Sequence, residues 1–225
     1  MSVWAVLVAA GAGVRFGGER PKAFAALAGR PLLAESLERL DASPRVDGII
    51  LVAPFDWEEP AILLAEELGA GKLSACVAGG ASRGESVRIG VGEVPPEAEV
   101  ILVHDAARPL VDDDVIGRVL APLSEGWDGA VPGEPVPDTV KRVDTEGTVL
   151  ETVDRAGLYA VQTPQGFRAE VFRRALAQVA DETTDCAGIV ERAGGRVRVV
   201  EGDPRLLKVT TPADLRSVEN LLAGN

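Results

Sequence analysis

Apolar residues form short continuous runs along this chain, and segments with helical spacing separate the runs. Three runs, one from Val3 and others over 48–53 and 100–103, predict strands that are buried on both faces, as in a parallel sheet. Further strands are predicted over 73–77 and 196–200. Apolar residues at helical intervals predict helices over 32–40, 61–68 and 213–222. This alternation favours a doubly wound, mostly parallel α/β fold, in which ligands bind at the carboxyl ends of the strands.

The first apolar run leads into a loop that combines glycines with cations. Gly11 and Gly13 remove side chains, so that backbone N–H groups can approach a phosphate closely. Arg15, Arg20 and Lys22 follow within the same loop and supply the charge that a polyphosphate needs. The loop therefore predicts a nucleoside triphosphate site at the carboxyl end of the first strand.

Two better-known phosphate-binding loops do not match this segment. A Walker loop requires Ser or Thr after Gly-Lys, whereas Gly71-Lys72 is followed by Leu73. A dinucleotide fingerprint requires a glycine at the position of Phe16. The glycines alone also fit an ordinary strand-to-helix turn, and it is the three cations that favour phosphate binding.

A second glycine segment follows the predicted strand 73–77. Ser82 and Glu85 have the spacing of a helix cap with its capping box. Gly79 and Gly80 stand just before this cap, and they are expected to leave backbone N–H and C=O groups free to read the edge of a base. The segment thus predicts both a helix start and a contact with the nucleotide.

The strand that begins at Val100 delivers His104 and Asp105 at its carboxyl end. A carboxylate there can bind Mg²⁺ together with substrate phosphates, although an aspartate at this point also fits a simple turn cap. Pairing with a triphosphate loop favours the metal. His104 is the only histidine, and we expect a buried, hydrogen-bonded structural residue there instead of a general base.

Composition narrows the classes of function. A chain of 225 residues fits one domain, residues 1–225, and its net charge of −12 argues against a nucleic-acid partner. A local group of cations can still bind small phosphates, because salt screens charges beyond about 8 Å. No apolar run predicts a membrane span, and the amino terminus has no basic segment typical of a secretory signal. Cys76 and Cys186 fit small buried hydrophobes in a reducing cytosol, so a cytoplasmic location is expected.

The middle of the chain departs from the α/β pattern. From Val131 to Val153, prolines, threonines and valines alternate with charges around the turn sequence Asp144-Thr145-Glu146-Gly147. This predicts two strands and a turn, that is, a β-hairpin arm within residues 131–155. Such an arm serves as a lid, as a dimer contact or as a plain edge hairpin, and the pattern alone leaves these open.

Together, these segments resemble the 2-C-methyl-D-erythritol 4-phosphate cytidylyltransferase family over nearly the whole chain. The matching blocks, in chain order, are Ala9–Arg15 with Pro21-Lys22, Gly79–Val87, His104–Pro109, Asp138–Arg142, Asp154-Arg155, Gln162–Gln165, Thr184-Asp185 and Leu207–Thr210. The resemblance implies a Rossmann-like nucleotidyltransferase fold with a protruding hairpin arm. It also implies transfer of the cytidylyl group of CTP to 2-C-methyl-D-erythritol 4-phosphate, with release of pyrophosphate, in isoprenoid precursor biosynthesis.

The same resemblance implies a role for each matching residue. Cytosine would be held by the backbone of the first loop and by the second glycine segment: Ala9, Ala10, Gly11, Ala12, Gly13, Gly80, Ala81 and Ser86. Arg15 and Lys22 would hold the phosphates, with Arg83 near the nucleotide. Asp105 would carry Mg²⁺ and contact the second substrate, which would also be bound by Arg108, Thr163 and Lys208. The arm would join a homodimer, in which Thr139 and Arg155 reach the partner subunit's substrate.

The chain departs from the family pattern at two places. Cys186 stands where an acidic residue is usual, and Gly188 stands where serine is usual. Ala23 follows Lys22 where glutamine is common. Local hydrogen bonding is expected to differ there, but every residue that carries charge to the phosphates is kept.

The expected mechanism depends on charge. A phosphate monoester is largely dianionic at neutral pH, because its second pKa is about 6, and it needs no general base. The enzyme must instead stabilise the charge that develops at the α-phosphorus. We expect Lys22 to stabilise this transition state, and Arg15 to assist with the leaving pyrophosphate.

Three alternatives remain at this point. The chain could use another sugar-alcohol phosphate, such as ribitol 5-phosphate, or a nucleotide with another base. It could also be a nucleotide-binding sensor without activity. Lys22 together with Asp105 argues against a sensor, which needs neither a metal ligand nor a cation at the α-phosphate.

Overall fold

The computed structural model describes residues 1–11, 20–178 and 185–224. Within these residues, the central sheet has eight strands in the order β10-β7-β11-β6-β1-β4-β5, with β12 beside β7. Six strands run in one direction: β1 (Val3–Val8), β4 (Gly48–Ala53), β5 (Leu73–Ala78), β6 (Val100–Asp105), β7 (Gly129–Pro135) and β12 (Val197–Glu201). Two are antiparallel to their neighbours: β10 (Tyr159–Val161) and β11 (Gln165–Arg168). The predicted mostly parallel α/β fold is confirmed.

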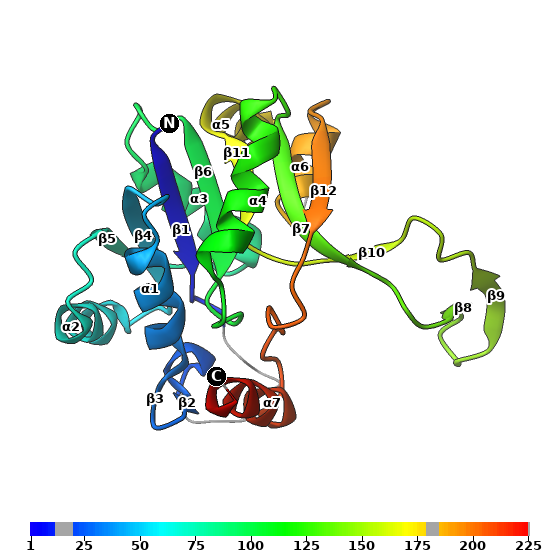
Figure 1. Cartoon of the computed structure of the whole chain (residues 1–225), viewed down its shortest axis with the longest axis horizontal. Helices are drawn as coiled ribbons and strands as arrows, with labels where there is room; N and C mark the ends of the chain where they lie inside the picture. Colours follow the sequence, from blue (N-terminus) through cyan, green and yellow to red (C-terminus); the bar gives the residue numbers. More distant parts are fainter. Residues whose placement is uncertain (12–19, 179–184, 225) are drawn as a thin grey trace.

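Helices cover both faces of this sheet (Figure 1). One layer contains α1 (Leu32–Ala42), α2 (Glu58–Leu68) and α4 (Asp113–Ser124), and the other contains α3 (Arg83–Glu93), α5 (Ala169–Gln178) and α6 (Ala187–Arg192). Successive strand residues face opposite layers, since Ala5 and Leu7 belong to the first core cluster and Val6 to the second. Burial on both faces explains why β1, β4 and β6 are mainly apolar runs.

A smaller layer closes the carboxyl end of the sheet. It consists of the 3₁₀ turn η2 (Lys22–Phe24), the short strands β2 (Ala26–Leu27) and β3 (Arg30–Pro31), and the last helix, α7 (Pro212–Ala223). Figure 1 shows α7 beside β2 and β3, below the ends of β1 and β6. Thr211 caps α7 and Pro212 occupies its first turn, as the sequence predicts.

The predicted helix over 61–68 starts earlier than expected. Helix α2 begins at Glu58, because the acidic residues Glu58 and Glu59 favour the positive end of the helix dipole and Pro60 is tolerated in a first turn. Its predicted end is confirmed, since Gly69 adopts a left-handed φ of 66° there.

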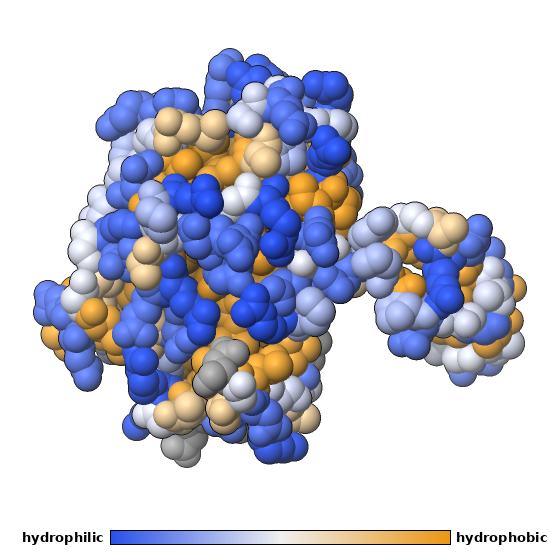
Figure 2. Space-filling model, viewed as in Figure 1, coloured by the Kyte–Doolittle hydropathy of each residue, from blue (hydrophilic) through white to orange (hydrophobic). Residues whose placement is uncertain are grey.

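The predicted boundary of the arm, 131–155, is wrong at its start. Residues 131–135 belong to β7, which pairs with β10, β11 and β12 in the central sheet. The hairpin proper consists of β8 (Val140–Val143) and β9 (Val149–Val153), which form a separate two-stranded sheet. It stands away from the body of the molecule, and apolar side chains are visible on its surface (Figures 1 and 2).

Two further observations concern the composition. No helix in the described ranges is long and apolar enough to span a membrane. Both cysteines are free thiols; Cys186 is buried as expected, but Cys76 is only half-buried, because β5 lies at the edge of the sheet.

Candidate active site

The carboxyl ends of β1 and β6 open into a pocket of about 350 Å³. After β1, the chain forms β4 and β5 on one side of β1 and then crosses over to form β6 on the other side, so the strand order reverses between β1 and β6. Ligands bind at this point in doubly wound sheets. The lining of the pocket combines both glycine segments with charged residues. Among the lining residues are Ala9, Ala10, Gly11, Lys22, Gly80, Ala81, Ser82, Arg83, Ser86, Asp105 and Lys208. The predicted convergence of the three segments on one crevice is confirmed.

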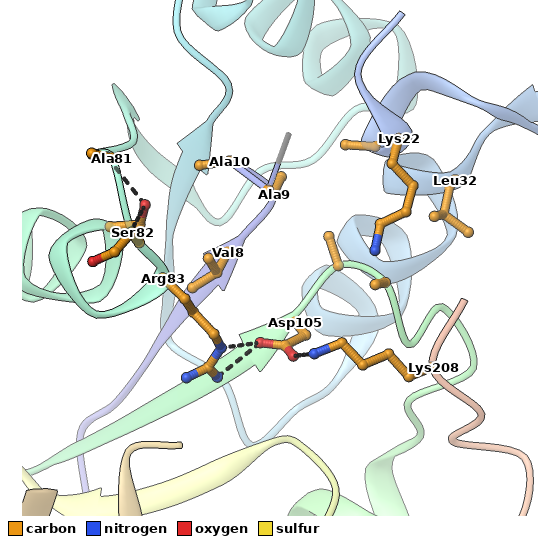
Figure 3. Close-up of a pocket in the computed structure, with 16 residues that line it drawn as sticks. Val8, Ala9, Ala10, Lys22, Leu32, Ala81, Ser82, Arg83, Asp105 and Lys208 are labelled. Atoms are coloured by element: carbon orange, nitrogen blue, oxygen red, sulfur yellow. Dashed lines mark hydrogen bonds and ion pairs between the residues drawn. The ribbon is translucent and has the colours of Figure 1, made fainter. Parts of the chain in front are cut away.

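Asp105 lies at the centre of the charges in this pocket (Figure 3). Arg83, from α3, donates to Asp105 Oδ1 through Nε at 2.9 Å and Nη2 at 2.8 Å. From the other side, Lys208 donates to Oδ2 at 2.6 Å. Burial alone raises the pKa of Asp105, but Arg83 and Lys208 outweigh it and hold that pKa well below its usual range.

Lys22 faces the same pocket from η2. Its Nζ donates to the backbone carbonyl of Val209 at 2.9 Å, just beyond Lys208 in the sequence. Together with Arg83 and Lys208 it makes three cations against the single carboxylate of Asp105 among the described lining residues. The pocket therefore carries a local positive charge on a chain whose net charge is −12.

The second glycine segment is organised by Ser86 and Glu85. Gly80 N donates to Ser86 Oγ at 3.1 Å, and Ala81 N donates to Glu85 Oε2 at 2.7 Å. Gly79 N bonds to the carbonyl of Ala53 in β4. The expectation that the N–H groups of Gly79 and Gly80 are free is therefore wrong, because the protein itself satisfies them.

Glycine is nevertheless required in this segment, for a different reason. A Cβ on Gly79 would lie 2.1 Å from Ala10 Cβ, and one on Gly80 would lie 2.3 Å from Glu85 Cγ. The segment packs directly on the end of β1 and on the first turn of α3. Its glycines thus allow close packing between the two sides of the pocket.

The departure from the family pattern at Cys186 lies next to Arg83. Arg83 Nη1 donates to Cys186 Sγ at 3.6 Å, and burial raises the pKa of this thiol to about 11. The Cys186 thiol beside Arg83 is therefore uncharged. Asp185 and Gln165 complete the local network, since Gln165 Nε2 donates to Asp185 Oδ2 and Cys186 N donates to Gln165 Oε1.

His104 is fully buried and structural, as expected. Its Nε2 lies 3.0 Å from the carbonyl of Arg108, so this nitrogen must carry the proton. Thr163 Oγ1 accepts from Asp105 N and lies 3.0 Å from His104 Nδ1, which leaves its hydroxyl proton for that nitrogen. One neutral imidazole thus satisfies both partners, and burial lowers the pKa of His104 to about 4.

This lowered pKa predicts that stability falls on mild acidification. An unfolded histidine titrates near 6.5, so between pH 6.5 and about 4 the unfolded chain binds the extra proton and is favoured. We expect the free energy of unfolding to fall by about 2 kcal/mol between pH 7.5 and pH 5 from this group alone. Urea unfolding of the wild type and of His104→Asn at both pH values measures it. Equal losses in the two proteins would contradict the assignment.

The other residues expected to bind the second substrate differ in how they lie relative to the pocket. Thr163, which precedes a cis proline, accepts a hydrogen bond from the backbone N of Asp105 and does not line the pocket. Arg108 donates to the carbonyls of Leu206 and Val161, and burial lowers its pKa. Thr139 and Arg155 are exposed at the base of the arm and are not brought to the pocket within one chain. Ala12, Gly13 and Arg15 lie outside the described residues.

Sequence reasoning missed the groups that hold the cations in place. The carbonyls of Leu206 and Val209 bind Arg108 and Lys22, and the side chain of Gln162 binds the backbone of Asp203 nearby. Backbone carbonyls have no residue-type signature, so no pattern predicts them. Gln162 stands within a matching block, next to Thr163, and that was the available signal.

Comparisons with known proteins agree on one family. A family model for 2-C-methyl-D-erythritol 4-phosphate cytidylyltransferase matches residues 3–224. A protein of that name from Nocardia farcinica is 47% identical over 221 residues, which are 98% of this chain and 94% of the relative. One from Saccharopolyspora erythraea is 46% identical and covers 99% of this chain and 100% of its own.

Solved structures give the same result. The 4-diphosphocytidyl-2C-methyl-D-erythritol synthase from Anaerococcus prevotii is 26% identical, with a TM-score of 0.85 over 99% of this chain and 98% of its own. The 2-C-methyl-D-erythritol 4-phosphate cytidylyltransferase from Thermus thermophilus is 32% identical, with a TM-score of 0.79 over 97% and 98%. The chain therefore belongs to the 2-C-methyl-D-erythritol 4-phosphate cytidylyltransferase family, a family of CTP-dependent nucleotidyltransferases in isoprenoid precursor synthesis.

Proposed function

We propose that the pocket between β1, α3 and β6 transfers the cytidylyl group of CTP to 2-C-methyl-D-erythritol 4-phosphate and releases pyrophosphate. The observation that carries this proposal is the presence of three cations, two of them paired with Asp105, in a pocket of about 350 Å³, a size suited to a small ligand. Gly11, on the wall formed by the first glycine segment, suits the close approach of a nucleotide.

For the nucleotide, we assign cytosine to the walls and the phosphates to the cations. Ala9, Ala10, Gly11, Gly80, Ala81 and Ser86 would meet the base, as would Ala12 and Gly13, and Arg83 would lie near the nucleotide. Lys22 would stabilise the charge that develops at the α-phosphorus, and Arg15 would assist with the leaving pyrophosphate. The position of Lys22 at the pocket supports its part of this assignment.

For the second substrate, we assign Asp105, Arg108, Thr163 and Lys208 from the same chain. The proton of the Thr163 hydroxyl is committed to His104, so Thr163 would meet a substrate hydroxyl as an acceptor. Asp105 would accept from hydroxyls as well, because its low pKa keeps it ionised. Lys208 and Arg108 would bind the phosphate.

The reaction needs no general base, and the pocket supports this reading. A phosphate monoester is already a nucleophile at neutral pH, since its second pKa is about 6. The buried imidazole next to the pocket holds its proton towards Arg108 O and stays neutral through the physiological range. What the pocket supplies instead is fixed positive charge.

The fold family implies a divalent cation such as Mg²⁺, and Asp105 would hold it. A carboxylate has about four lone-pair sites, and Arg83 and Lys208 use three at Asp105, so one remains, which takes either the ion or a substrate hydroxyl at a time. Among the described residues, no group of three or more His, Cys, Asp or Glu side chains forms a metal site. This donor set fits an ion that arrives with phosphate ligands. Bound there, the ion would neutralise phosphate charge.

We also propose a homodimer that forms through the arm and a cytoplasmic location. Val149 and Leu150 are exposed on β9, with Leu150 61% accessible, and both side chains are apolar. Thr139 and Arg155, exposed at the base of the arm, would then reach the partner subunit's substrate. The two free thiols support a reducing compartment.

Gel filtration tests the arm. We expect the wild type to elute at twice the mass of one chain, and Leu150→Asp to elute as a monomer with lower activity, because a charge is costly in an apolar interface. Leu63→Asp is the matched control, since Leu63 is 57% exposed on α2, away from the arm. A monomeric wild type would leave Thr139 and Arg155 without their proposed role.

A pyrophosphate assay tests the reaction. With Mg²⁺, CTP and 2-C-methyl-D-erythritol 4-phosphate we expect turnover, and the same assay with ribitol 5-phosphate or with each of the other three nucleoside triphosphates should be far slower. Faster release with ribitol 5-phosphate would reassign the second substrate. Tight CTP binding without any release would instead indicate a nucleotide sensor.

A further inference from the structure

Residues 202–210 cross the end of the sheet between β12 and α7 without helix or strand structure; we call this segment the strap. Three cations of the site depend on it. Lys208 belongs to it, Lys22 Nζ donates to Val209 O at 2.9 Å, and Arg108 donates to Leu206 O. An irregular segment has no ladder of hydrogen bonds to fix its path, so its anchors determine where these cations lie.

Gln162 forms the buried anchor at the start of the strap. Its Nε2 donates to Asp203 O at 2.9 Å, and its Oε1 accepts from Asp203 N at 3.0 Å. The carboxamide thus holds both backbone groups of one residue, and Gln162 is only 8% exposed. Asp203 O also closes the turn that leads to Leu206, since Leu206 N donates to it.

The other side-chain anchors near this point are less buried. Arg118, at intermediate exposure, donates to Glu201 O and to Gly202 O. Arg205 pairs with Asp112 and Asp203, but the Arg205 side chain is 45% exposed. Ion pairs that face solvent contribute little to stability, typically under about 1 kcal/mol, because water and salt screen them. The carboxamide of Gln162 is therefore the most buried side-chain anchor of this part of the strap, beside the backbone bond from Gly202 N to Gly133 O.

Gln162 also connects the strap to Asp105. Its neighbour Thr163 accepts from Asp105 N at 3.1 Å. Thr163 thus holds Asp105, and the adjacent Gln162 holds the strap, which carries Lys208, through its bonds to Asp203. The 2.6 Å contact between Lys208 and Asp105 closes this loop of contacts.

We propose that Gln162 is a positioning residue for the second-substrate site, which sets Lys208 against Asp105 through the strap. This inference rests on the role proposed above for Lys208. Gln162 itself does not line the pocket, so it acts through the strap and not by contact with a substrate.

The first test compares Gln162→Leu with Ser43→Ala. Leucine keeps the size of the side chain and removes both bonds to Asp203. We expect KM for 2-C-methyl-D-erythritol 4-phosphate to rise by about ten- to a hundredfold, as for a misplaced binding group, with a much smaller change in KM for CTP. Ser43 is the matched control, since it is 3% exposed and, at the end of α1, donates to Asp113 at the start of α4. Equal KM values in the two variants would overturn the proposal.

A second variant, Gln162→Glu, keeps the shape of the clamp but makes it depend on pH. A protonated carboxyl can donate to Asp203 O and accept from Asp203 N, whereas a carboxylate can only accept. Burial raises the pKa of such a carboxyl, and so does the charge of Glu134, whose Oε1 lies close to Gly202 beside the clamp, whereas Arg118, which donates to Gly202 O, and Arg205, which pairs with Asp203, oppose this rise. We expect kcat/KM of Gln162→Glu, relative to the wild type, to recover as the pH falls from about 8 to 6. A relative kcat/KM that stays low and does not change with pH would overturn the proposal, because it would indicate only a loss of stability.

A double-mutant cycle separates this inference from the proposed role of Lys208. If Gln162 acts through Lys208, Gln162→Leu adds little to the KM effect of Lys208→Ala, because coupled residues are not additive. Additive effects would overturn the inference and leave the role of Lys208 intact. An unchanged KM in Lys208→Ala alone would overturn the role of Lys208 itself.

Discussion

Lys22→Ala is expected to lower kcat by about 10²–10³-fold, the usual effect of losing one preorganised charge at a transition state. Lys22 reaches the pocket from η2, and its Nζ donates to Val209 O, next to Lys208 in the sequence. This contact aligns the ammonium before substrate arrives. KM for CTP should change less than kcat, because the interaction strengthens only as charge develops at the α-phosphorus. Steady-state pyrophosphate release measures both constants.

Lys72→Ala is the control for this variant. Lys72 also donates from Nζ to a backbone carbonyl, that of Ser43, at 2.6 Å, but it lies away from the pocket. Loss of one such bond costs about 1 kcal/mol of stability in either variant. Turnover close to the wild type in Lys22→Ala would remove the catalytic role from this residue.

Asp105→Asn is expected to damage both stability and the second-substrate site. The amide has the same shape, but it leaves Arg83 and Lys208 without the negative charge that pairs them. Removal of one partner from a buried ion pair costs on the order of 3 kcal/mol, and Asp105 is 6% exposed. KM for 2-C-methyl-D-erythritol 4-phosphate should rise as well. Urea unfolding and the pyrophosphate assay measure the two effects.

The pH dependence of the stability loss has a definite sign. The cations hold the folded pKa of Asp105 below its unfolded value of about 3.9, so its contribution is complete above that value and is lost as the pH falls below it. The gap between wild type and Asp105→Asn should thus stay constant above about pH 5 and narrow towards pH 3. Asp113→Asn is the control, because its pair with Arg45 is exposed and should contribute under about 1 kcal/mol. A gap that widens in acid would contradict the ion-pair account.

The parallel half of the sheet was predictable because burial on both faces leaves a direct mark in the sequence. Strands β1, β4 and β6 are six-residue runs with apolar positions on both faces, and their predicted positions are confirmed. Strand β7 was misread because it contains Pro132, Gly133 and Pro135, which argue against a central strand. Long-range packing against β12 and β11 overrides that local preference, and this is invisible in a short window.

The site was predictable where chemistry requires a particular side chain, and much less so where it requires a backbone atom. Asp105 and Lys22 were identified because charge at the end of a strand or in a glycine loop is informative, and Lys208 was identified through the resemblance to the family. The amides of Gly79 and Gly80 were assigned to a ligand, although Ala53 O and Ser86 Oγ already accept from them. Partners of backbone groups depend on the folded geometry, so residue type cannot reveal them.

The position of the single histidine has a practical consequence for spectroscopy. His104 is the only imidazole in the chain, and its ring contacts Thr163 Oγ1 and the carbonyl of Arg108, with Asp105 next to it in sequence. These neighbours are the residues proposed to meet the second substrate. The proton resonances of that one ring are therefore the only histidine resonances of the chain, and we expect them to shift when the pocket is occupied.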